Sequence, residues 1–164
     1  MPCPSQKSRS TLDIGSVFLH FGFDGHTQVK DRYFVVVASE SCSFLCFTAS
    51  TQAYLTANPK FRTEVTPAIR ARDECFPKDC VIDCRNLIPF DDVLLSSYLT
   101  SGRVKPVGAL SLAGVAAILK TVQASRILAL KDKRIVAEAL RAILSPSIEA
   151  GPAVPRPDRT TGSA

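Results

Sequence analysis

The stretch RYFVVVASESCSFLCFT, residues 32–48, decides the fold, because it has the pattern of a β-hairpin. Two runs rich in Val and Phe, 32–37 and 44–48, flank the polar residues Ser39-Glu40-Ser41. Strands that are covered on both sides read as continuous apolar runs. We therefore expect this hairpin at the centre of a sheet.

The register of this hairpin predicts a functional pair. A three-residue turn centred on Glu40 would place Arg32 directly opposite Thr48, with Cβ atoms about 5 Å apart. A guanidinium beside a hydroxyl is a plausible phosphate-binding arrangement. With a two-residue turn, Arg32 would instead face Ala49, and Thr48 would point to the other side of the sheet.

Short strands followed by helices predict an α+β domain built on a small antiparallel barrel. The further strands are expected at 15–21, 61–67, 80–84 and 104–108, with a short helix at 91–100. Pro106 lacks a backbone donor, which favours an edge position for the last strand. Ser111 is a good N-cap for an amphipathic helix ending near Ser125, and a second helix should run over 127–144.

Length and composition indicate one globular domain of 164 residues with 46% hydrophobic content. We expect a flexible leader at 1–12, a barrel domain with its helix at 13–125, an additional helix at 126–145 and a disordered tail at 146–164. No apolar run approaches the roughly 18 residues of a membrane span. We therefore expect a cytoplasmic protein that does not associate with membranes.

The net charge of +5 belongs to the last third of the chain. Residues 1–100 carry ten Lys or Arg against eleven Asp or Glu, and residues 101–164 carry ten against four. A solvated helical face is the ordinary meaning of such a bias. A surface for nucleic acid or an acidic partner is the alternative.

The six cysteines are interpreted as reduced residues of the core. Cys42 and Cys46, like Cys80 and Cys84, are four residues apart in expected strands and therefore about 13 Å apart. That span is too long for a disulfide within either pair, and the spacing does not suit a zinc knuckle. A cross-strand metal site or a redox pair is the alternative.

Five segments in this order resemble the MazF/PemK family of toxin endoribonucleases. GSVFL (15–19) resembles the family's opening strand, KDRYFVVV (30–37) its "KxRPvlVl" strand, and FTAS (47–50) its "iTSk" segment. PKDCVIDCRNL (77–87) resembles "KdSvvxcdqi", and VGALS (107–111) resembles the helix entry "iGxLs". The resemblance covers roughly residues 13–125.

The resemblance implies an SH3-like barrel that works as a homodimer, cleaves single-stranded RNA and is held inactive by an antitoxin protein. Arg32 and Thr48 occupy the positions of the family's catalytic Arg and Thr. They would serve attack of a ribose 2′-hydroxyl on the adjacent phosphate, with Arg32 stabilising the developing charge. The resemblance implies no metal and no cofactor.

Four further residues are expected to bind RNA: His26, Lys30, Ser50 and Thr51. A lone loop histidine and hydroxyls at a strand end are also ordinary structural residues. Tyr33 stands where the family has proline, and Thr51 stands where it has lysine. The alternative function is therefore a catalytically inactive barrel that binds a protein or a nucleic acid.

Overall fold

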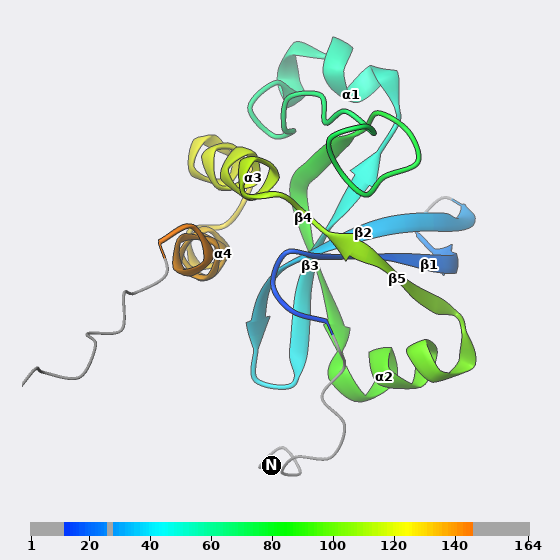
Figure 1. Cartoon of the computed structure of the whole chain (residues 1–164). Coiled ribbons are helices and arrows are strands. Elements are labelled where there is room, and N and C mark those ends of the chain that lie inside the picture. The colour runs from blue at the N-terminus through cyan, green and yellow to red at the C-terminus, as the bar shows by residue number, and fades with distance from the viewer. Residues whose placement is uncertain (1–11, 26–27, 146–164) are drawn as a thin grey trace, which may run out of the picture.

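Five antiparallel strands form one sheet in the order β4-β3-β2-β1-β5 (Figure 1). The computed structural model describes residues 12–25 and 28–145, so the expected tail and nearly all of the expected leader lie outside the described residues. The strands are β1 (Ser16–Asp24), β2 (Val29–Glu40), β3 (Ser43–Ser50), β4 (Val81–Asp91) and β5 (Val104–Ala109). The helices are α1 (Ala53–Ala57), η1 (Pro59–Phe61, a 3₁₀ turn), α2 (Asp92–Ser101), α3 (Leu112–Ala124) and α4 (Leu130–Leu144). The α+β class is confirmed.

The expected central hairpin is confirmed as β2 and β3, which occupy interior positions of the sheet. Residues 34–38 of β2 are buried without interruption, because both faces of the sheet are covered. The turn has two residues, Ser41 and Cys42, between the paired Glu40 and Ser43. Ser41 has a φ of 51°, and a positive φ at the first turn residue is typical of the two-residue turns that match strand twist.

The expected opposition of Arg32 and Thr48 is wrong, since Thr48 pairs with Phe34. Two features cause the difference. The turn is shorter than expected and lies further along the chain, at Ser41 and Cys42, which displaces the pairing by three residues, and the register shift between Val36 and Ala38 takes back one of them. The two changes together move the register by two residues, so Arg32 and Thr48 still lie on the same face of the sheet as diagonal neighbours.

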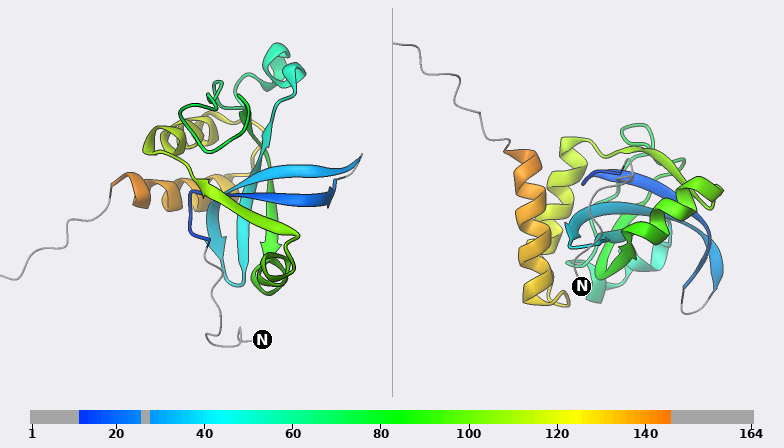
Figure 2. Two further views of the ribbon diagram at one scale, coloured as in Figure 1. Left: turned by 45° about the vertical axis from the view of Figure 1, so that its right-hand side comes forward. Right: turned by 90° about the horizontal axis from the view of Figure 1, so that it is seen from below.

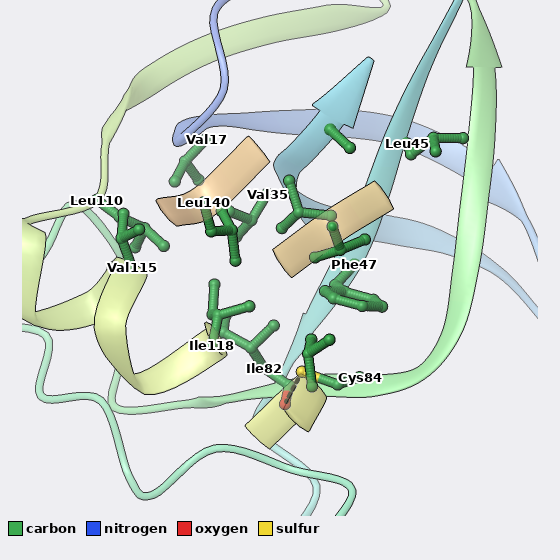
Figure 3. Close-up of a cluster of buried hydrophobic side chains, with 14 of the residues drawn as sticks. Val17, Val35, Leu45, Phe47, Ile82, Cys84, Leu110, Val115, Ile118 and Leu140 are labelled. Carbon is green, nitrogen blue, oxygen red and sulfur yellow. Dashed lines mark hydrogen bonds between the residues drawn. The ribbon is translucent and has the colours of Figure 1, made fainter. Parts of the chain in front are cut away.

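One face of the sheet packs against α3 and α4, which lie side by side (Figures 1 and 2). Side chains from strands and helices meet in this core, as Figure 3 shows for Val35, Phe47, Ile82, Ile118 and Leu140. Ser111 caps α3 as expected, because its hydroxyl accepts a hydrogen bond from the amide of Gly114. The helices therefore follow directly from the apolar spacing of their sequences.

The opposite face carries a second, aromatic core. Phe18, Phe34 and Phe90 pack together there, with Leu95 of α2 against them. Asp91 caps α2 by accepting from the amide of Leu94. None of the helices in the described residues is long and apolar enough to span a bilayer.

The sheet is open, because β4 and β5 lie at its two edges and do not pair with each other in the described part of the chain. Edge strand β5 contains Pro106, as expected. The strand expected at 61–67 is not formed. That segment holds a 3₁₀ turn and further turns, and it adds to β4 only through isolated bridges such as that between Val65 and Asp83.

Two glutamates attach the long segment between η1 and β4 to the two ends of α3. Glu74 accepts hydrogen bonds from the amide and the hydroxyl of Ser111, at the start of the helix. The buried Glu64 accepts from the Ser125 hydroxyl and from the Arg126 amide, where the helix ends. Glu74 thus satisfies the free amide at the start of α3, and Glu64 satisfies donors in the chain that leaves its end.

The cysteine interpretation needs one correction. Cys46, Cys75, Cys80 and Cys84 are free thiols, as expected, whereas Cys42 is disulfide-bonded. Burial raises the pKa of Cys80 to about 11, so this thiol is protonated near neutral pH. No group of three or more potential metal ligands occurs among residues 12–25 and 28–145.

His20 makes the stability of the second core dependent on pH. Its buried ring lies against Phe23, Phe34 and Tyr98, and burial lowers its pKa below the ordinary value. The unfolded chain therefore takes up a proton at His20 before the folded chain does. We expect the free energy of unfolding to fall as the pH drops below about 6.5 and through the lower folded-state pKa.

Urea titrations at several pH values check this expectation. In the variant His20→Phe, the loss of stability that begins near pH ~6.5 should disappear, while losses that arise from carboxylates at lower pH remain. An unchanged pH profile in this variant would show that His20 is not the titrating group.

Candidate functional site

A groove of about 930 Å³ lies where the ends of β2 and β3 meet β4 and α1. Strands from both halves of the sheet contribute to it, so it depends on the tertiary fold rather than on one segment. Its polar lining consists of Asp24, Gln28, Lys30, Arg32, Thr48, Ser50, Gln52, Tyr54, Asp83, Arg85 and Asn86. The groove therefore combines three cations and two carboxylates with hydroxyls and amides.

Arg32 is the least satisfied polar side chain of the groove. Its Nε is buried and has no hydrogen-bond partner, and its guanidinium forms no ion pair with any described residue. The backbone of Gly25 passes close to it, since a Cβ at that position would lie 3.5 Å from Nη2 of Arg32. Buried donors without partners are rare and costly, so a ligand acceptor beside this guanidinium would remove an existing penalty.

The expected site residues are partly brought together. Lys30, Arg32, Thr48 and Ser50 all line the groove, although Arg32 and Thr48 are not opposite each other. Thr51 does not line it and is exposed beside it. His26 lies outside the described residues.

A second hollow of about 330 Å³ adjoins the groove and shares Lys30, Arg32 and Ser50 with it. Thr51 and Lys78 are among its other lining residues. Neither Lys30 nor Lys78 takes part in an ion pair among the described residues. Arg32 thus lines two adjoining hollows, together with Lys30 in both and Lys78 in the second.

Sequence reasoning missed a partly buried ion pair in the groove. Arg85 donates to Asp83 from Nε at 2.9 Å and from Nη2 at 2.7 Å, and Asp83 pairs across the sheet with Thr48. Hydrogen bonds with Asp83 raise the pKa of Arg85. The two residues are two apart in a strand and hence share a face, which is the signal that could have revealed them.

An aromatic ring fixes the same guanidinium from outside the sheet. The centroid of the Phe61 ring, on η1, lies 4.2 Å from Cζ of Arg85. Cation–π contacts of this kind add about 0.5–2 kcal/mol, depending on exposure. Because both the ion pair and the ring hold Arg85, it is a rigid cation of the groove.

The groove also offers surfaces for flat, uncharged groups. Tyr54 of α1 is 53% exposed, and Phe23 is half-buried at the end of β1. Gln52 and Asn86 supply amide donors and acceptors nearby. Cations unpaired among the described residues, such as Lys30 and Arg32, beside aromatic rings are the combination that single-stranded nucleic acids bind.

The chain has no match among the protein-family models that were compared with it, and none among the curated proteins.

Proposed function

We propose that this chain is a MazF/PemK-like endoribonuclease that cleaves single-stranded RNA in the groove, without a metal ion. In this proposal the open sheet corresponds to an SH3-like barrel, and the chain acts as a homodimeric cytoplasmic toxin paired with an antitoxin protein. The observation that carries the proposal is the buried, unpartnered Nε of Arg32 in a groove with Lys30, Thr48 and Ser50.

The chemistry requires stabilisation of a phosphate as its charge grows. The ribose 2′-oxygen attacks the neighbouring phosphorus, and the bond from phosphorus to the 5′-oxygen breaks. Arg32 would stabilise the equatorial oxygens electrostatically as their negative charge grows. Thr48 would donate a hydrogen bond to a non-bridging oxygen. Solvent takes the proton from the 2′-hydroxyl and returns one to the 5′-oxygen.

The test is the chemistry of the products. Single-stranded RNA incubated with the full chain in excess chelator should give fragments that end in 2′,3′-cyclic phosphate. An oligonucleotide with 2′-deoxy sugars throughout should bind and remain intact, because it lacks the nucleophile. Cleavage of the deoxy strand, or dependence on added metal, would contradict the mechanism.

A non-catalytic nucleic-acid-binding module is the second candidate function, and one observation favours it. Asp83 is the buried carboxylate of the groove, and both of its oxygens are bound by Arg85. It is therefore poorly placed to accept a proton from a substrate. Tight RNA binding with no cyclic-phosphate product would support this candidate over the endoribonuclease.

A further inference from the structure

A separate hollow of about 410 Å³ lies between η1 and the turn that joins α3 to α4. It is lined by Pro59, Lys60, Arg62, Thr63, Glu64, Arg126 and Ile127. Three of these residues are cations, and they come from segments more than 60 positions apart in the sequence. The fold therefore gathers positive charge here that the sequence does not show as a cluster.

The three cations of this hollow are available to a ligand. Lys60, Arg62 and Arg126 are exposed, and none of them forms an ion pair with a described residue. Like charges on neighbouring side chains repel one another, and an anion bound among them would relieve that repulsion.

Glu64 is the acidic residue of the hollow, and its carboxylate faces hydrogen-bond donors of the fold rather than the open space of the hollow. Its carboxylate accepts from the Ser125 hydroxyl, from the Arg126 amide at 2.7 Å and from the Thr63 hydroxyl at 3.1 Å. Burial alone would raise the pKa of Glu64, but these hydrogen bonds hold it below the ordinary value. The carboxylate is thus a fixed structural anion that positions Arg126 beside Arg62 rather than a partner for their side chains.

Phe61 links this hollow to the groove. Phe61 stands between Lys60 and Arg62 in the chain, and its ring packs on the groove residue Arg85. Cationic side chains thus continue from Arg32 and Arg85 in the groove, past Phe61, to the hollow. This continuity favours an extended polyanion over an isolated anion or an acidic peptide.

We infer that this hollow is a second phosphate-binding site, which holds the backbone of a nucleic acid strand whose other part lies in the groove. The inference rests on the proposed function in that the strand in the groove is RNA. The hollow adds a phosphate contact that a short strand bound in the groove does not reach. Nucleic acid affinity should then depend on strand length and, for long strands, more steeply on salt.

The test compares two double variants of the full chain that remove the same charge. Arg62→Gln with Arg126→Gln removes two cations of the hollow, and Arg134→Gln with Arg141→Gln removes two exposed cations of α4 that line no described hollow. Binding is measured over a salt series, with 2′-deoxy single strands of about 4 and about 16 nucleotides.

We call Arg62→Gln with Arg126→Gln the hollow variant and Arg134→Gln with Arg141→Gln the α4 variant. For the long strand, the plot of log affinity against log salt should be less steep in the hollow variant than in the unmodified chain, by about 1.4 in slope, or about 0.7 for each lost phosphate contact. Its affinity for the short strand should stay unchanged, and the α4 variant should bind both strands like the unmodified chain. An unchanged slope with the long strand, or an equal loss in both variants, would overturn the inference. A third result would also overturn it: polyglutamate binds the unmodified chain and the α4 variant but not the hollow variant, while the hollow variant still binds the long strand normally. The hollow would then bind an acidic peptide.

The same data separate this inference from the proposed function. Suppose that Arg32→Ala lowers the affinity for the short strand, while the hollow variant binds the long strand as tightly as the unmodified chain. The groove then binds RNA and the hollow does not. If Arg32→Ala has no effect on either strand, the groove proposal itself fails.

Discussion

Replacing Arg32 with alanine should lower the rate of RNA cleavage by about 10²–10³-fold, the usual effect of removing one preorganised donor to a developing oxyanion. The loss should appear in both KM and kcat, because Arg32 is proposed to bind the phosphate in the ground state and to bind it more strongly in the transition state. Arg32→Lys should recover only part of the rate, since an ammonium lacks the planar fork of a guanidinium. Initial rates on a fluorescent single-stranded RNA measure both variants.

The stability of the Arg32→Ala variant distinguishes a functional from a structural arginine. Nε of Arg32 is buried without a partner, so its removal abolishes an unsatisfied donor. Tm should therefore stay the same or rise. Arg72→Ala, which removes an exposed arginine outside the groove, is the matched control and should leave the cleavage rate unaltered. A fall in Tm with full cleavage activity would assign Arg32 to the scaffold.

Replacing Glu64 with alanine should lower the free energy of unfolding by about 3–5 kcal/mol, because buried donors are left without their charged acceptor. The donors that lose their partner are the Ser125 hydroxyl and the Arg126 amide. Glu64→Gln should cost less, since an amide oxygen still accepts one of these bonds. Urea unfolding measures both, and Glu138→Gln on the exposed side of α4 is the matched control.

The pH dependence of the unmodified chain provides a second measurement on Glu64. Its folded-state pKa is lowered, so its contribution to stability is present above the unfolded value of about 4.3 and is lost as the pH falls through the folded value. In the variant Glu64→Gln, the free energy of unfolding should lack this loss at low pH. If Glu64→Gln were as stable as the unmodified chain at neutral pH, the carboxylate would not be what holds the α3–α4 turn.

Local sequence patterns predicted the elements well where a single physical cause decides them. The apolar run of β2 and β3 predicted their central place, Ser111 predicted the start of α3, and Pro106 predicted an edge strand. The alternation at 61–67 was misleading. Val65 and Thr66 are buried there beside β4, so the segment has a strand-like pattern without forming a strand.

The candidate site was only partly predictable, because its geometry depends on pairings between distant segments. The resemblance directed attention to Arg32 and Thr48, and both line the groove. Their register depended on the turn length and on an irregularity that no residue type signals. The contact of Phe61 with Arg85 joins a turn to a strand across more than 20 positions, and no sequence spacing reveals it.

The register shift between Val36 and Ala38 divides β2 into two independently paired parts. The inner part is aligned on both sides, by Val35 with Val17 of β1 and with Phe47 of β3. Register errors at the turn can therefore be absorbed at the shift before they reach Arg32. Residues inserted on the β2 side of the turn, ahead of the disulfide-bonded Cys42, should therefore leave the groove in place.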